Sequence, residues 1–524
     1  MAITKVTGAL LGNYTGGSAD DTVVVGDGAG DAITTGVDNT LIGDNAGTAL
    51  TEGSNNVAIG NEALASNTTG SRNVAIGYAS LDAATTAVNN TAVGNSSMSA
   101  NTSGTSNVAV GRNAMLANTT GDNNTAVGMS SLDANTTGTE NVAVGKDAMG
   151  ANTTGSYNTA VGGYGTLDAN TTANNNTAIG AGVLTVNTTG AANTSVGAYS
   201  LDANTTGDDN VAVGYGALSA NTTADYNVAV GKSALAANTT GAENTAVGAN
   251  ALDANTTGSY NSAFGLGSLG TNTTASYSTA VGWAALYAST TASYNTAVGV
   301  SALGSDTTGN ANIAIGYYAG EGITTGSGNT FMGYRAGTYV RDATTGSYNT
   351  ILGSYSYTAA TDTAEAVIIG HSVQGASSYT TLGYGGNDIR TAHGSTSWET
   401  ISDERVKKDI EDATVGLAFI NDLRPVTFNY KNKGDIPKNF RDYEENSTEV
   451  YKNSKTQHGF IAQEVKAAID KHSDIKDGFS MWNDYDPAGQ QRVSEAAVIP
   501  VLVKAVQELS AQVEELKAQI NEEK

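Results

Sequence analysis

Short apolar runs alternate with polar, turn-forming residues at a constant interval along most of the chain. Each run has the form Asn-(Thr/Val)-Ala-(Val/Ile)-Gly, as in residues 56–60 and 73–77, and nearly all intervals between the closing glycines, from Gly26 to Gly370, are 17 residues. The run fits one short strand, and a Leu or similar residue four positions after the glycine is expected to centre a second strand. Asn-Thr-Thr-Gly segments are turn signals that also interrupt any helix.

A single unit of this size cannot bury its own apolar face, so the units are expected to stack. We expect Val/Ile and Leu columns to form a narrow core, with successive coils hydrogen-bonded at a spacing of roughly 4.8 Å. About twenty coils then give a shaft on the order of 100 Å long. The Asn four residues before each glycine is expected to form a ladder that satisfies backbone groups of the turns.

The Ala two residues before each glycine is expected to point away from the Val/Ile column, because successive side chains of a strand alternate in direction. A small residue repeated at this position suits the close approach of another chain. We therefore interpret the Ala column as the seam of a homotrimer. The alternative is that Ala fills a tight bend within one chain.

The repeat resembles the left-handed β-roll heads of trimeric autotransporter adhesins, which are built from Asn-x-(Val/Ala)-Ile-Gly units. The resemblance covers roughly residues 22–370. Those heads use shorter units, and the additional residues here form the Asn-Thr-Thr-Gly segment. The resemblance implies a three-chain rod with an adhesive surface.

Charge and composition narrow the classes of partner. The chain carries a net charge of −25 and no Cys. Residues 1–401 hold 8 Lys and Arg against 27 Asp and Glu, so this acidic part is expected to repel nucleic acid and anionic membrane surfaces. Without Cys, no disulfide and no thiolate metal site can form. We expect no cofactor and no metal, and we find neither the apolar run of a signal peptide nor a segment that approaches the apolar length of a membrane helix.

The composition changes near residue 400, where Lys, Arg and Glu become frequent. Residues 402–410 and 414–423 suit helices, residues 426–430 alternate as a strand, and another helix is expected to open at residues 460–465. The tail, about residues 497–522, carries a heptad seam in which spacings of three and four alternate. Its β-branched and Leu positions favour a coiled coil of two helices in isolated peptides. The shaft instead argues for an assembly of three chains.

Four motifs in residues 402–524 resemble, in order, the endosialidase-type intramolecular chaperone found at the end of phage tail spikes and fibres. They are Ser402-Asp-x-Arg-x-Lys407, Leu423-Arg-Pro-Val-x-Phe-x-Tyr430, His458-Gly-Phe-Ile-Ala-Gln-Glu-Val465 and Pro500-Val-Leu-Val-Lys-Ala-Val-Gln-Glu-Leu509. The resemblance implies a domain that trimerises, guides the preceding β fibre into register and is then released by self-cleavage before the Ser of the first motif.

Carried onto this chain, the resemblance makes Ile401–Ser402 the scissile bond, Ser402 the nucleophile and Lys407 the general base, with His458 as a helper. A Ser hydroxyl needs such a base, and burial can lower the pKa of a Lys far enough for it to serve. The alternatives are that Ser402 caps a helix, that Lys407 lies on a solvated face and that His458 is structural. Whether the chain acts as an enzyme beyond this step stays open, and no activity on a separate substrate is expected.

Residues 371–401 break the 17-residue period and gather Tyr379, Tyr384, His393 and Trp398. Self-cleavage would make this region the tip of the mature fibre, so we predict that these four residues contact the host. The alternative is a simple neck between two folds. Tyr also recurs five residues before several unit glycines, where its faces could stack on sugars, or where it is an exposed loop residue without a ligand.

The sequence therefore predicts a mostly β protein: a trimeric parallel β-roll or solenoid shaft followed by a small α+β chaperone domain with a C-terminal coiled coil. The expected domains are a virion-attachment segment (1–21), the shaft (22–370), the neck or tip (371–401) and the chaperone domain (402–524). We expect a phage tail fibre subunit, made in the bacterial cytoplasm and located in the virion. Its partners would be a tail or baseplate protein and a host surface receptor, expected to be a glycan. A bacterial trimeric surface adhesin and a depolymerase spike that degrades capsule or lipopolysaccharide remain alternatives.

Overall fold

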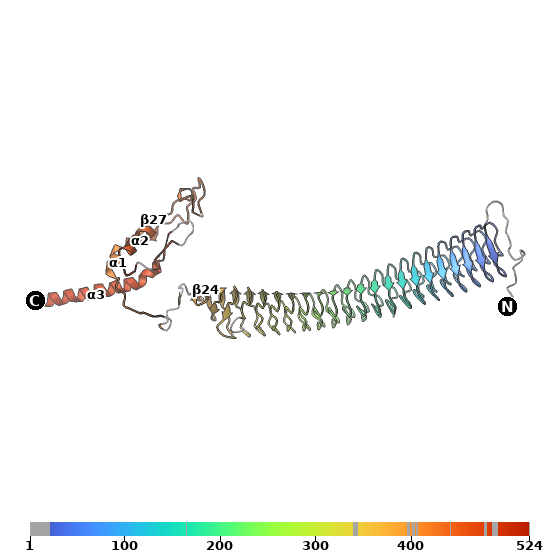
Figure 1. Ribbon diagram of the computed structural model, residues 1–524, viewed down its shortest axis with the longest axis horizontal. Helices are drawn as coiled ribbons and strands as arrows, with labels where there is room; N and C mark the ends of the chain where they lie inside the picture. Colours follow the sequence, from blue (N-terminus) through green and yellow to red (C-terminus); the bar gives the residue numbers. More distant parts are fainter. Residues whose placement is uncertain are drawn as a thin grey trace. The chain divides into compact units, whose positions relative to one another are not determined.

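The computed structural model divides into two compact units, residues 1–401 and residues 402–524. It describes residues 21–163, 165–338, 344–395, 399–400, 404, 407–440, 442–475, 479–484 and 491–522. The first unit is a shaft of stacked coils, as Figure 1 shows. The second is a small mixed module that ends in a long helix.

The shaft is a parallel β-solenoid of about 21 turns, which confirms the predicted fold class. Each strand pairs with the equivalent strand of the next coil, as in Val57↔Val74, an offset of 17 residues. The offset is 18 residues at Thr159↔Thr177 and 20 at Thr330↔Thr350. The strands in chain order are β1 (Val23–Val25), β2 (Thr40–Ile42), β3 (Val57–Ile59), β4 (Val74–Ile76), β5 (Thr91–Val93), β6 (Val108–Val110), β7 (Thr125–Val127), β8 (Val142–Val144), β9 (Thr159–Val161), β10 (Thr177–Ile179), β11 (Thr194–Val196), β12 (Val211–Val213), β13 (Val228–Val230), β14 (Thr245–Val247), β15 (Ser262–Phe264), β16 (Thr279–Val281), β17 (Thr296–Val298), β18 (Ile313–Ile315), β19 (Thr330–Met332), β20 (Thr350–Leu352) and β22 (Val367–His371).

The last coils of the shaft pass into antiparallel structure. Strand β24 (Tyr379–Tyr384) still pairs in parallel with β22, but it forms a hairpin with β25 (Asn387–Ala392). Strand β26 (Glu399–Thr400) adds to β25 in antiparallel orientation. Two short strands, β21 (Tyr357–Thr358) and β23 (Gln374–Gly375), pair beside this region. Residues 379–392 therefore extend the sheet of the shaft.

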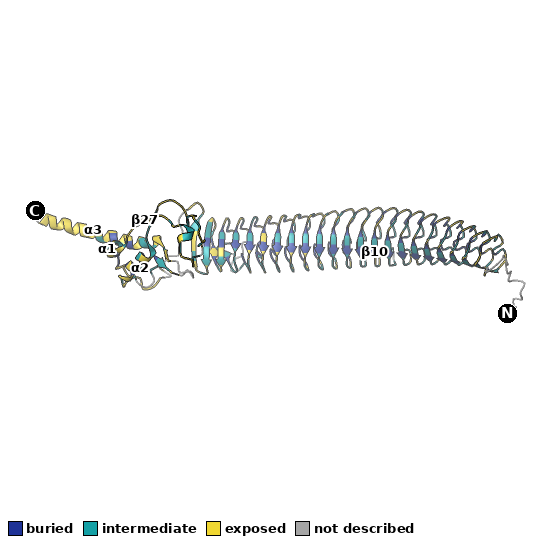
Figure 2. Ribbon diagram, turned by 90° about the horizontal axis from the view of Figure 1, so that it is seen from above, coloured by how far each residue is buried: buried dark blue, intermediate teal, exposed yellow. Residues whose placement is uncertain are grey.

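The Ala column lies inside the coil, not at its surface. In β3 and β4 the central residues, Ala58 and Ala75, are fully buried, whereas the flanking Val and Ile are only half-buried. Figure 2 shows the same buried centre along the row of strands. The prediction that Ala forms an intermolecular seam is therefore wrong, because this column shares the narrow interior of the coil with the Leu column. Phe331 is also fully buried in the strand column, but there the Leu position is Gly337, where a Cβ would lie 2.6 Å from the Phe331 ring. The Val/Ile positions face outward.

The predicted second strand is present only in the last of the described coils, as β21 and β23, which begin four residues after Gly353 and Gly370. In the other described coils a turn takes its place. Leu64 and Leu81 are fully buried, as expected for a core column, but their backbones are left-handed, with φ of 56° and 52°. Their N–H groups still reach the next coil, donating to Ser80 O at 2.9 Å and Ser97 O at 3.0 Å. A tight turn therefore carries the Leu column, because extended backbone there would not close so small a coil.

The predicted Asn ladder is confirmed. Asn73 Nδ2 donates to Asn56 Oδ1 at 3.1 Å and to Ala87 O at 2.8 Å, and this pattern repeats along the column. A second ladder runs through the Asn of the Asn-Thr-Thr segments, where Asn135 Nδ2 donates to Asn118 Oδ1 at 2.8 Å. Buried amides are tolerated here because most of them find partners in neighbouring coils, although Asn67 Nδ2 has none among the described residues.

Asp306 occupies a position of the second ladder that is Asn in most coils. Its Oδ1 accepts from Gly309 N at 2.8 Å and its Oδ2 accepts from Asn295 Nδ2 at 3.1 Å. Burial raises the pKa of Asp306 to about 7, although the hydrogen bond from Gly309 N–H works in the opposite direction. The folded coil therefore binds a proton at a pH at which the unfolded chain, with an ordinary carboxyl, does not.

Between about pH 4 and 7 the folded state thus holds more protons than the unfolded state, so the stability of this coil falls as the pH rises and levels off above 7. We expect Asp306→Asn to remove this dependence and to stabilise the coil by roughly 4 kcal/mol at pH 8. Hydrogen exchange of residues 299–316 at pH 5 and pH 8, corrected for intrinsic rates, measures the difference. Equal pH dependence in wild type and variant would contradict the buried carboxyl.

The C-terminal module packs two helices and a hairpin around a small core. Phe419 and Met481 are fully buried at its centre, together with Val465 and Ile469. Its elements are α1 (Leu417–Asp422), β27 (Val426–Phe428), η2 (Lys433–Asp435), β28 (Gln457–Gly459), α2 (Ala462–Asp470), β29 (Trp482–Asn483), β30 (Arg492–Val493), η3 (Glu495–Val498) and α3 (Ile499–Glu522). Three of the expected elements are present, as α1, β27 and α2. The helix expected over residues 402–410 is not found at the described positions 407–410, where Ile410 is exposed.

The terminal helix is confirmed as a single helix, α3. Its first turns pack on the module through Val501 and Ala505, and Glu508 accepts a hydrogen bond from Leu417 N at 2.8 Å. By length and composition alone, residues 495–522 are apolar enough to cross a membrane, so the expectation that no segment reaches that length is wrong. Two charged residues, Lys504 and Glu508, lie near its middle, which disfavours burial in lipid.

Candidate functional site

Three of the four chaperone-like motifs lie side by side in the C-terminal module. Strand β27 of the second motif pairs antiparallel with β28 of the third, with Thr427 opposite His458. The same two motifs are joined by an ion pair in which Arg424 Nε donates to Glu464 Oε2 at 2.9 Å. Arg424 lowers the pKa of Glu464 through this hydrogen bond. The fourth motif forms the part of α3 that binds the N-terminus of α1 through Glu508.

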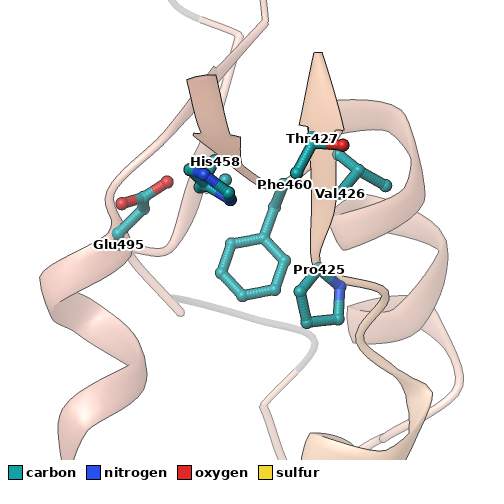
Figure 3. Close-up of a pocket in the computed structure, with 7 residues that line it drawn as sticks. Pro425, Val426, Thr427, His458, Phe460 and Glu495 are labelled. Carbon is teal, nitrogen blue, oxygen red and sulfur yellow. The ribbon is translucent and has the colours of Figure 1, made fainter. Parts of the chain in front are cut away.

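A pocket of about 480 Å³ opens where these motifs meet. In Figure 3 the carboxylate of Glu495 points toward the imidazole of His458, and Phe460 and Pro425 line the space beside them. Gly459 makes room for this arrangement, because a Cβ at that residue would lie 2.8 Å from Glu495 Oε1. His458 is exposed, so its imidazole is accessible to solvent and to a group bound in the pocket.

The lining of this pocket offers an acid–base pair but no strong nucleophile. Its one hydroxyl is that of Thr427. The predicted nucleophile, Ser402, lies outside the described residues. Lys407 is exposed, is not helical, and its N–H donates to Glu404 O at 3.0 Å. The roles given to Ser402, Lys407 and His458 therefore stay predictions.

The heptad face of α3 is open to solvent. Its apolar residues are between 41% and 59% exposed, although all would be buried in a coiled coil. These residues are Ile499, Leu502, Val506, Leu509, Val513, Leu516 and Ile520. The helix thus presents a continuous apolar stripe that its own chain does not cover.

Three of the four residues predicted to contact a host, Tyr379, Tyr384 and His393, lie within the described part of the chain. Tyr384 stacks on His371 with ring centroids 5.1 Å apart, whereas Tyr379 lies under Arg390 at 5.1 Å. His393 is exposed, and Trp398 lies outside the described residues. The prediction of a shared binding surface at residues 371–401 is not tested by these positions.

Sequence reasoning missed a column of rings directly after the unit glycines. Tyr317 stacks on Tyr334 at 5.3 Å, and Tyr355 links Tyr334 to His371 at 5.1 and 5.9 Å. The sequence does contain a signal for this column of rings, because aromatic residues stand one or two positions after successive unit glycines. The row of Tyr five residues before the glycine was noticed, and three of its members, Tyr260, Tyr277 and Tyr294, stack on one another at 4.8 and 5.2 Å.

Residues 402–474 match the protein family described as chaperone of endosialidase. The match contains the first three motifs and ends before α3. The comparisons with curated proteins and with solved structures found no significant match. The C-terminal module is thus similar to an intramolecular chaperone, and the shaft is characterised by its own structure.

Proposed function

We propose that this chain is one of three identical subunits of a phage tail fibre that binds the host surface. The observation that carries the proposal is the outward face of the solenoid sheet. The column formed by the last residue of each strand is apolar throughout, mostly Val or Ile, whereas the column formed by the first residue is mostly Thr or Val. Both columns are half-buried or exposed and continue from β2 to β20. An apolar column of this length indicates an interface.

The size of this face suits a stable assembly. About 21 coils at roughly 4.8 Å, with a strand of about 10 Å across, give on the order of 1,000 Å² for each chain. A standard interface buries about 800 Å² on each partner. The exposed heptad face of α3 adds a second uncovered stripe in the other unit. The number three rests on the resemblance to trimeric adhesin heads and chaperone domains.

The C-terminal module is proposed to assemble the shaft. A long parallel solenoid has many near-equivalent registers, because each coil resembles the next, and three chains must start from the same one. A helix that trimerises first would fix that register. The similarity of residues 402–474 to a chaperone supports this role.

Removal of residues 402–524 is therefore expected to leave a shaft chain that does not assemble. We would express residues 1–401 alone and the full chain carrying Ser402→Ala, and determine the mass of each in solution. The full chain is expected as a three-chain species, and the shortened chain as aggregates or single chains. Efficient assembly of the shortened chain into a three-chain species would contradict the proposed chaperone role.

Self-cleavage is proposed at the Ile401–Ser402 bond, which is also the boundary between the two compact units. The Ser402 hydroxyl would attack the Ile401 carbonyl, the ester would then be hydrolysed, and the fragments 1–401 and 402–524 would result. On a denaturing gel, freshly expressed wild type is expected to give these two fragments, whereas Ser402→Ala and Lys407→Ala give one full-length band. A full-length wild-type band identical to that of Ser402→Ala would refute the cleavage.

A further inference from the structure

One coil of the shaft interrupts two of its side-chain columns with glycine. At the second position after the unit glycine, one coil has Asn250 and the next coil has Gly267. At the fifth position, the same two coils have Asp253 and Gly270. Gly270 has no positive φ that would demand glycine. A Cβ at Gly270 would instead lie 3.0 Å from Tyr287 Cε2, so the missing side chain makes room for the Tyr287 ring.

These two gaps open a hollow of about 570 Å³ on the flank of the shaft. Asn250 and Asp253 line it from the preceding coil, and Trp283 and Tyr287 line it from the following coil, with Leu266 beside them. The volume lies within the range of about 300–1,000 Å³ that is typical of small-molecule sites. Such sites combine aromatic walls with a few polar groups, as this one does.

The rings of this hollow differ from the other aromatic residues of the shaft. Tyr260, Tyr277 and Tyr294 lie nearly parallel, with interplanar angles of 5° and 1°, so they cover one another's faces. Trp283 and Tyr287 have no such ring partner among the described residues, and they are 52% and 50% exposed. Their apolar surface is therefore free to contact a ligand.

The polar lining restricts the charge of that ligand. Asp253 is the one ionisable carboxylate of the lining, and no Lys or Arg contributes to it. The first unit as a whole is acidic. An anionic sugar would be repelled, whereas hydroxyl groups can donate to the Asp253 carboxylate and exchange hydrogen bonds with the Asn250 amide.

We propose that the hollow lined by Asn250, Asp253, Trp283 and Tyr287 binds a neutral pyranose unit of a surface polysaccharide. The C–H face of the sugar packs on Trp283 and Tyr287, and its hydroxyls contact Asp253 and Asn250. The proposal rests on the proposed host-binding function and specifies its ligand class. It places a contact on the shaft flank in addition to the predicted tip.

The test uses the full chain and soluble trisaccharides of glucose, mannose, galactose and N-acetylglucosamine, with trigalacturonate as the acidic counterpart. Binding is followed by saturation-transfer NMR and by titration. At least one neutral trisaccharide is expected to bind saturably, with a Kd of about 1 mM or below. Trp283→Ala, which removes a wall, and Gly270→Asp, which fills the hollow, are each expected to weaken binding about tenfold or more.

Tyr215→Ala is the matched control, because Tyr215 occupies the position of Trp283 in another coil and is 57% exposed, but does not line the hollow. It is expected to change the affinity less than about twofold. Absence of saturable binding by every neutral trisaccharide, tighter binding of trigalacturonate, or unchanged binding in both hollow variants would overturn the proposal. Sedimentation of the same samples separates the two proposals: a three-chain wild type that binds no sugar refutes only the sugar site, whereas a single-chain wild type refutes the proposed assembly.

Discussion

Gly214→Ala is expected to disrupt the solenoid around its coil. Gly214 directly follows β12 and has a φ of +137°, a conformation that L residues rarely adopt, and a Cβ there would lie 2.5 Å from Gly231 O in the next coil. Neither problem can be relieved by a side-chain rotation, because the colliding atom is backbone. We expect a loss of at least about 4 kcal/mol, the range of exceptional single substitutions.

Gly216→Ala, two residues away in the same coil, is the matched control. Gly216 also has a positive φ, but nothing lies within 4 Å of an added Cβ. In another coil the equivalent position is Ala284, with a φ of 53°. We expect a cost of about 1 kcal/mol. Thermal unfolding and hydrogen exchange of residues 195–231 measure both variants, and similar losses for the two would contradict the backbone collision.

Placing charges on the outward sheet face is expected to abolish assembly while leaving the coil intact. Val213 and Val230 end β12 and β13, and their side chains point away from the buried Ala of the same strands. In the double variant Val213→Asp and Val230→Asp, each copy would bring two carboxylates into the proposed interface. Burying an unpaired charge costs several kcal/mol, and the neighbouring chains offer no cation in this stripe.

The control places the same charges in the same two coils, at the exposed turn residues Thr206 and Thr223. Thr206→Asp and Thr223→Asp are expected to sediment like wild type. The Val variant is expected to sediment as single chains with an unchanged β-type circular dichroism spectrum, because the Ala and Leu core is untouched. Assembly of the Val variant to the wild-type mass would show that the outward face is not the interface.

The repeat made the solenoid and the Asn ladder predictable, because both follow from a fixed interval and from residues with one evident use. Which face of the strand points to the interior of the coil was not predictable in the same way. Alternation states that Ala58 and its neighbours Val57 and Ile59 face opposite sides, but not which side is the interior. The interior is shared by the strand column and the Leu column of the turn, so the small residue faces inward where Leu fills the remaining space. This is a property of the closed coil and not of the strand.

The site in the C-terminal module was also predictable only in part. The motifs located β27, β28 and α2, and the structure brings them together. The contact of Glu495 with the His458 pocket was not predictable, because the two residues are far apart in the chain and Glu495 lies outside the recognised motifs. The hollow at Gly270 was hidden for another reason: its signal is a missing side chain, which is visible only when equivalent positions of adjacent coils are compared.

Sedimentation equilibrium of the purified full chain carrying Ser402→Ala, at concentrations from low micromolar upward and without denaturant, tests the central claim most directly. Chains joined along the Val/Ile face and along α3 predict a mass of three subunits that persists on dilution. A well-ordered single subunit of 52.9 kDa would contradict it.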